Sequence, residues 1–75
     1  MPNDIVANWE VIIHKNARTS DGGDAGNVVE VEDETLTLER GPTVEYVIPK
    51  SSVGGFDGSE VTLTISLKEL NNQYR

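Results

Sequence analysis

The chain has 75 residues, no cysteine, and 13 acidic against 6 basic side chains. This length fits one domain, and the lack of cysteine excludes disulfides and thiolate metal sites. The net charge of −7 argues against binding to nucleic-acid phosphates, and no apolar run is long enough to cross a bilayer. We therefore expect a single cytoplasmic domain over residues 1–75, with no signal peptide, no membrane insertion and no nucleic-acid partner.

The first third of the chain is expected to hold an arm, one strand and a loop. Residues 1–8 are interpreted as an N-terminal arm. Trp9, Val11 and Ile13 recur at every second position, which predicts a strand with these three side chains facing inward. Residues 16–26 are the most polar and glycine-rich stretch, and they are expected to form a mobile loop.

The middle of the chain alternates apolar and polar side chains in three further runs, which predicts strands with one buried face. Their inward residues are expected to be Val29, Val31, Leu36, Leu38, Val44, Tyr46 and Ile48. Asp33-Glu34 indicates a tight hairpin between the first two runs. Arg40-Gly41-Pro42 indicates the next turn, because proline fixes its φ angle and cannot continue the ladder.

Three shorter signals follow. A proline in the first position suggests one helical or 3₁₀ turn over residues 49–53. Residues 54–59 contain an Asp-Gly pair and three glycines in all, which predicts a longer turn. The alternation over residues 61–65 predicts a final strand.

The end of the chain shows a helix start signal. Ser66 and Glu69 have the spacing of a capping box, which predicts a short helix through Leu70. Leu67 and Leu70 lie three positions apart and are expected to close one end of the core. Residues 71–75 are polar and are expected to form a frayed tail.

Five or six short strands with almost no helix predict an all-β fold. The expected form is a small antiparallel five- or six-stranded barrel with a short C-terminal helix. Closure into a barrel would remove exposed sheet edges from a chain this short.

Three segments in order resemble the PRC-barrel family: SDGGDAGNVVEV (20–31), EYVIPKSSV (45–53) and FDGSEVTLTISLKEL (56–70). The resemblance covers about residues 9–70 and is greatest to small stand-alone, archaeal-type members. It implies a protein interaction and assembly module without a common enzymatic activity, such as an adaptor in cell division. The alternative that it implies is a factor in RNA processing or ribosome maturation, like the barrel of RimM. Gly26 precedes the valine strand, a typical place for a bulge or a close backbone approach.

No arrangement of residues indicates a reaction, so we expect no enzyme, no catalytic residue, no cofactor and no dedicated metal site. His14 is the single histidine, and alternation places it on the surface. Asp21 and Asp24 do not have the spacing of a calcium loop. The acidic hairpin at residues 30–34 leaves a third function open, weak binding of a divalent cation.

Candidate partner-binding residues are the apolar side chains expected on the outer face: Ile12, Val28 and Val47. If the strands bring the three together, they form a patch for a protein partner or a second copy of the chain. The alternative is that they lie in a second small core beneath the C-terminal helix. Lys50 and Ser51, in the turn after the Ile-Pro step, are further candidates. The acidic surface favours a basic partner.

Overall fold

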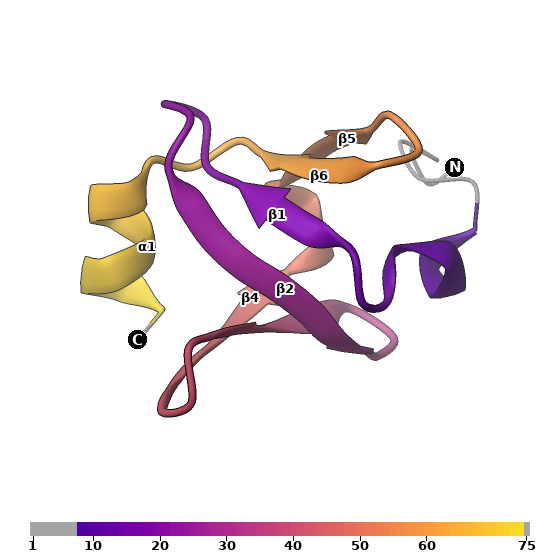
Figure 1. Ribbon diagram of the computed structural model, residues 1–75, viewed down its shortest axis with the longest axis horizontal. Helices are drawn as coiled ribbons and strands as arrows, with labels where there is room; N and C mark the ends of the chain where they lie inside the picture. Colours follow the sequence, from indigo (N-terminus) through magenta and orange to yellow (C-terminus); the bar gives the residue numbers. More distant parts are fainter. Residues whose placement is uncertain (1–7, 75) are drawn as a thin grey trace.

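The computed structural model describes residues 8–74, which form one rolled sheet with three short helices (Figure 1). The strands are β1 (Asn16–Arg18), β2 (Asp24–Val31), β3 (Thr35–Arg40), β4 (Val44–Pro49), β5 (Val53–Phe56) and β6 (Glu60–Leu63). The helices are the 3₁₀ turns η1 (Trp9–Ile12) and η2 (Lys50–Ser52) and the α-helix α1 (Leu67–Gln73). The predicted β-rich fold with a C-terminal helix is therefore confirmed.

The six strands lie in the order β4-β3-β2-β1-β6-β5. Neighbours are antiparallel except β1 and β6, which are parallel. The sheet is not closed, because β4 and β5 are its two outer strands and do not pair with each other. The expectation of an all-antiparallel sheet is thus wrong, because local alternation carries no information about pairing between the first and the last strand. Closure into a barrel is not seen.

The core lies on the inner face of the roll. Its fully or almost fully buried apolar side chains are Ile12, Ala17, Ala25, Val28, Leu36, Leu38, Tyr46, Ile48, Val53, Val61, Leu63 and Leu70. Burial of each large apolar side chain contributes about 1.5–3 kcal/mol before entropy is counted. Figure 1 shows η1 and α1 at opposite ends of the sheet. Leu70 is buried and Leu67 packs against the core, which confirms the predicted end closure.

The first strand was predicted in the wrong place, because Trp9–Ile12 form a 3₁₀ turn instead. The side chain of Asn8 caps this turn by accepting a hydrogen bond of 3.0 Å from the backbone N–H of Glu10. A turn of three residues brings Ile12 to the same side as Trp9. Ile12 is therefore fully buried, whereas Val11 is 46% exposed.

The predicted loop at residues 16–26 is also wrong at both of its ends, which belong to β1 and β2. The connection between these strands is short and is held by Thr19. The backbone N–H of Thr19 donates to the carbonyl oxygen of Gly23 at 2.9 Å, and its Oγ1 accepts from the N–H of Gly23 at 2.8 Å. These bonds turn the chain back into the sheet within five residues.

The C-terminal third confirms two predictions and corrects three. The 3₁₀ turn η2 and the capping box of α1 are both present. Residues 53–56, however, form β5 rather than a turn, and β6 ends at Leu63. Helix α1 continues to Gln73, so most of the predicted tail is helical. The predicted N-terminal arm, apart from Asn8, lies outside the described residues, as does residue 75.

Candidate functional site: a sheet face of valines and glutamates

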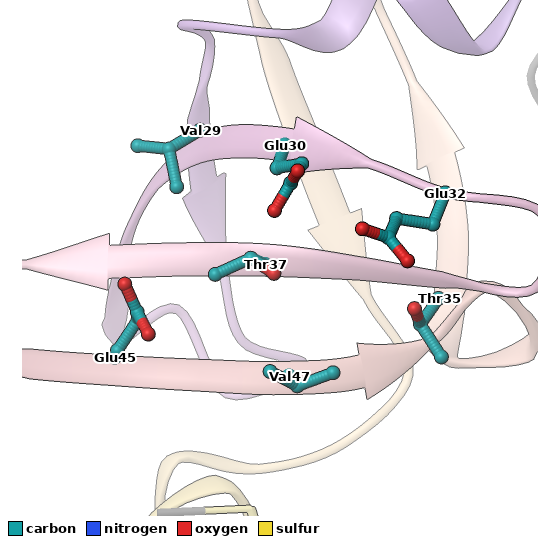
Figure 2. A pocket seen from close by; sticks show the side chains of 7 residues that line it. All are labelled: Val29, Glu30, Glu32, Thr35, Thr37, Glu45 and Val47. Carbon is teal, nitrogen blue, oxygen red and sulfur yellow. The ribbon is translucent and has the colours of Figure 1, made fainter.

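A bulge in β2 decides which of its side chains face outward. Val28 pairs with Leu38 and Glu30 pairs with Thr37, so Val29 is an extra residue in the ladder. Val28 consequently points into the core and is fully buried. The side chains of Val29 and Glu30, although adjacent in sequence, both reach the outer face of the sheet (Figure 2).

These two side chains belong to a shallow hollow of about 440 Å³ on the outer face of β2, β3 and β4. The hollow is lined by Val29, Glu30, Glu32, Thr35, Thr37, Glu45 and Val47. We call these seven residues the valine–glutamate face. The threonine side chains of β3 form its floor, and the valine and glutamate side chains of β2 and β4 stand along its two sides (Figure 2). Val47 is 52% exposed, so its apolar surface is open to a partner.

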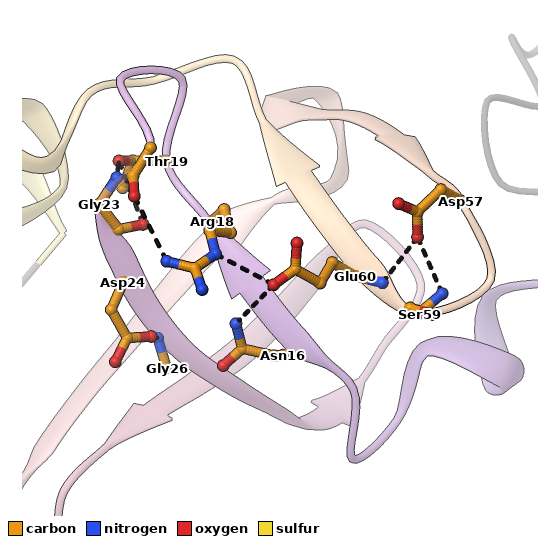
Figure 3. Close-up of polar contacts among 10 residues, drawn as sticks. Asn16, Arg18, Thr19, Gly23, Asp24, Gly26, Asp57, Ser59 and Glu60 are labelled. Atoms are coloured by element: carbon orange, nitrogen blue, oxygen red, sulfur yellow. Dashed lines mark hydrogen bonds and ion pairs between the residues drawn. The ribbon is translucent and has the colours of Figure 1, made fainter.

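The carboxylates of this face form no ion pair with any of residues 8–74. The single ion pair in this part of the chain joins Arg18 Nε to Glu60 Oε2 at 3.0 Å, on β1 and β6 (Figure 3). Asn16 Nδ2 donates to the same Glu60 oxygen at 3.4 Å. The glutamates on β2 and β4 therefore present negative charge that no ion pair offsets, beside the exposed Val47 and the half-buried Val29.

Two cations near the acidic strands are engaged elsewhere. Arg40 donates a hydrogen bond of 3.2 Å to the carbonyl oxygen of Asp24, and its guanidinium lies 5.7 Å from the centre of the Tyr46 ring. Lys50 Nζ donates to the carbonyl oxygen of Asp33 at 3.0 Å and lies 4.9 Å from the Trp9 ring centre. Neither cation neutralises the glutamates of the valine–glutamate face.

The same face borders a strand edge that is unpaired within residues 8–74. The backbone N–H of Lys50 donates to the carbonyl oxygen of Glu34 at 2.8 Å, and the register of β3 and β4 continues from this pair without a bulge. Residues of an antiparallel strand alternate between bonding to the neighbour and facing away from it. Tyr46 and Ile48 therefore bond to β3, and the backbone groups of Glu45 and Val47 point toward the outer edge.

Only part of the predicted partner-binding set lies on the surface. Ile12 and Val28 are fully buried in the main core, so the expected three-residue outer patch does not exist. The 3₁₀ turn η1 places the Ile12 side chain in the core instead of on the outer face. The bulge in β2 does the same for Val28. Val47 is exposed as predicted. Lys50 and Ser51 lie in η2, where Lys50 is half-buried and Ser51 is exposed.

Val29 is the member of the face that sequence reasoning placed inside. Val28 and Val29 are adjacent, so an alternating pattern fits equally well whether the first or the second of them points inward. The signal that separates them is the bulge, which depends on pairing with β3 and is not visible in the alternation of β2 itself.

Two aspartates outside this face have lowered pKa values. The pKa of Asp21 lies below its ordinary value, mainly because the Thr19 hydroxyl donates to its carboxylate, and the N–H of Leu67 donates to it at 3.3 Å. The pKa of Asp57 is lowered by hydrogen bonds from the N–H groups of Glu60 and Ser59, each at 2.8 Å (Figure 3). Both carboxylates have local structural partners that account for these shifts.

The remaining sequence candidates do not gather into a site. His14 is exposed and has a positive φ of 74°. Within residues 8–74, no three His, Asp or Glu side chains are grouped so that they would hold a metal ion. Weak cation binding by the acidic hairpin stays a prediction.

Comparison with protein-family models, with curated proteins and with solved structures gives no match to this chain. No helix in the described part of the chain combines the length and the apolar character needed to span a membrane.

Proposed function

We propose that the chain is a non-enzymatic protein–protein interaction and assembly module of the PRC-barrel type, acting in the cytoplasm, with its roll left open between β4 and β5. The observation that carries the proposal is the valine–glutamate face, where the exposed Val47 lies among glutamates that form no ion pair with residues 8–74. The sequence resemblance to PRC-barrel segments supports the same function.

The mechanism combines two contributions from this face. Burial of Val29 and Val47 against a partner supplies the hydrophobic term, at about 25 cal/mol for each Å² of apolar surface removed from water. Glu30, Glu32 and Glu45 attract basic side chains and speed the encounter with them. The partner that this surface fits is a protein with a basic segment.

A photo-cross-linking amino acid at position 47 tests the proposal in cells that make the protein naturally. The matched control places the same amino acid at Thr62, which is also an exposed strand residue. We expect a discrete protein adduct from position 47 and none from position 62. The position-47 adduct should disappear when Glu45→Lys is added.

A second variant, Val47→Asp, should abolish the complex while leaving the thermal unfolding midpoint almost unchanged. Equal adducts from both positions, no adduct, or adducts that nuclease removes would overturn the proposal. The last result would favour the alternative function in RNA processing or ribosome maturation.

A further inference from the structure

We infer that the partner binds as an extended basic segment that adds a seventh strand to the open edge of β4. This inference rests on the proposed function and specifies its binding mode. It follows from the position of the unpaired backbone groups relative to the valine–glutamate face.

The edge of β4 has unused hydrogen-bonding capacity. The N–H and C=O groups of Glu45 and Val47 point away from β3, and no hydrogen bond from another described residue reaches them. Pro49 lies at the next outward position, where the absence of an N–H costs no bond to β3. The carbonyl oxygen of Pro49, the N-cap of η2, is used by the first hydrogen bond of that turn. An added strand therefore finds two complete residues, Glu45 and Val47, to pair with.

The other outer strand is a poorer template. Strand β5 has four residues, two of which are Gly54 and Gly55, and a bulge interrupts its pairing with β6. Strand β4 has six residues and an uninterrupted register with β3. Regular pairing favours addition of a strand, and bulges and short length oppose it.

The side chains of the face determine what kind of strand fits. In a strand paired with β4, the residues opposite Glu45 and Val47 place their side chains on the same outer face. A lysine or arginine opposite Glu45 meets its carboxylate, and a β-branched residue opposite Val47 covers its exposed methyl groups. Glu30 and Glu32 lie on β2, three strand spacings of about 4.8 Å from the added strand, so they attract its basic side chains at longer range and not by direct contact.

A second copy of the chain fits this edge less well. Each copy has a net charge of −7, and pairing of two β4 strands would continue one acidic face into another. Like charges on neighbouring strands are destabilising. The charge of the face therefore favours a basic segment over self-association.

The test uses the intact protein, labelled with ¹⁵N, and a synthetic acetylated peptide. The peptide has lysine and valine in turn at the positions that face outward in a strand, and threonine at the positions between them. We expect amide hydrogen exchange at Glu45 and Val47 to slow when the peptide is added, with little change at Tyr46 and Ile48. N-methylation of the peptide amides that face β4 should weaken binding about tenfold, because two hydrogen bonds are lost. N-methylation of the intervening amides, whose N–H groups point away, is the matched control and should change binding less than twofold.

Variants of the protein separate backbone from side-chain recognition. Val47→Pro removes the outward N–H, and Val47→Thr keeps it with a β-branched side chain of similar shape. We expect the proline variant to lose peptide binding and the threonine variant to retain most of it. The thermal unfolding of Val47→Pro should show that the variant remains folded, because no internal hydrogen bond uses this N–H. If the proline variant unfolds, the comparison of the two N-methylated peptides decides the question alone.

Three outcomes would overturn the inference. Binding that is indifferent to the position of the N-methyl groups would mean that charge alone holds the peptide. Slowed exchange at Glu45 and Val47 that depends on protein concentration without peptide would indicate a second copy at the edge. Absence of peptide binding, together with a specific cross-link from position 47, would refute strand addition while leaving the proposed interaction function intact.

Discussion

Gly26 of β2 lies directly against the backbone carbonyl group of Glu39 on β3. A Cβ atom at position 26 would lie 2.7 Å from the carbonyl carbon of Glu39 and would overlap its oxygen. The φ angle of Gly26 is +91°, which side chains other than glycine rarely adopt. The close backbone approach predicted at this glycine is therefore confirmed.

Gly26→Ala should reduce the free energy of unfolding by more than about 2 kcal/mol, because conformational strain and a backbone clash add together. Urea denaturation measures the loss. Gly22 is the matched control, since its φ is +85° and nothing lies within 4 Å of its Cβ position. Gly22→Ala should cost only about 1 kcal/mol. Equal losses in the two variants would contradict the close contact at Glu39.

The same substitution on the two faces of the sheet should have different effects on stability. Val28→Ala removes buried methyl groups and should lower the free energy of unfolding by about 2 kcal/mol. Val47→Ala should change it by less than about 0.5 kcal/mol, because Val47 is 52% exposed. If denaturation ranked the two variants in the opposite order, the assignment of the faces by the β2 bulge would be wrong.

Asp21 should make stability depend on pH in acid. Its native pKa lies below the ordinary value of 3.8, so the unfolded chain takes up the proton first as the pH falls. The stabilisation by ionised Asp21 is present above about pH 4 and is lost as the pH falls through its native pKa. The difference in unfolding free energy between the wild type and Asp21→Asn should shrink between pH 6 and pH 2.5. A difference of constant size would show that the native pKa is not lowered. Asp57→Asn should behave in the same way.

Lys50 should influence both the emission of Trp9 and stability. The ammonium group lies 4.9 Å from the ring centre, and Trp9 is the only tryptophan in the chain. Lys50→Met should shift the emission maximum and cost about 0.5–1 kcal/mol, which is typical of a cation–π pair that water still reaches. Lys68→Met removes an exposed lysine from α1 and should change neither quantity. Identical behaviour of the two variants would exclude the Lys50–Trp9 interaction.

Sequence patterns were sufficient for the parts of the fold that depend on neighbours along the chain. The hairpin at Asp33-Glu34 is present, with the N–H of Glu32 donating to the carbonyl oxygen of Thr35 at 2.8 Å. The capping box also formed as predicted, because both of its hydrogen bonds join residues three positions apart. Turn chemistry and a period of two are local properties, so one sequence can reveal them.

The parts that depend on distant pairing were not predictable in this way. Strand β1 is only three residues long and is held by β2 and β6, so no alternation of its own marks it. Strand β5 contains two glycines that read as a turn, although its pairing with β6 keeps it extended. Within the candidate site, the outward position of Val47 was predictable because its strand pairs without a bulge. Val29 was missed because a bulge exchanges it with Val28.

The openness of the β4 edge is most directly tested by amide hydrogen exchange in the protein without any partner. The structure predicts rapid exchange at Glu45 and Val47 and strong protection at Tyr46 and Ile48, whose amides bond to β3. Protection of all four amides at low protein concentration would contradict this account, because it would mean that the edge is already covered and is closed to an added strand.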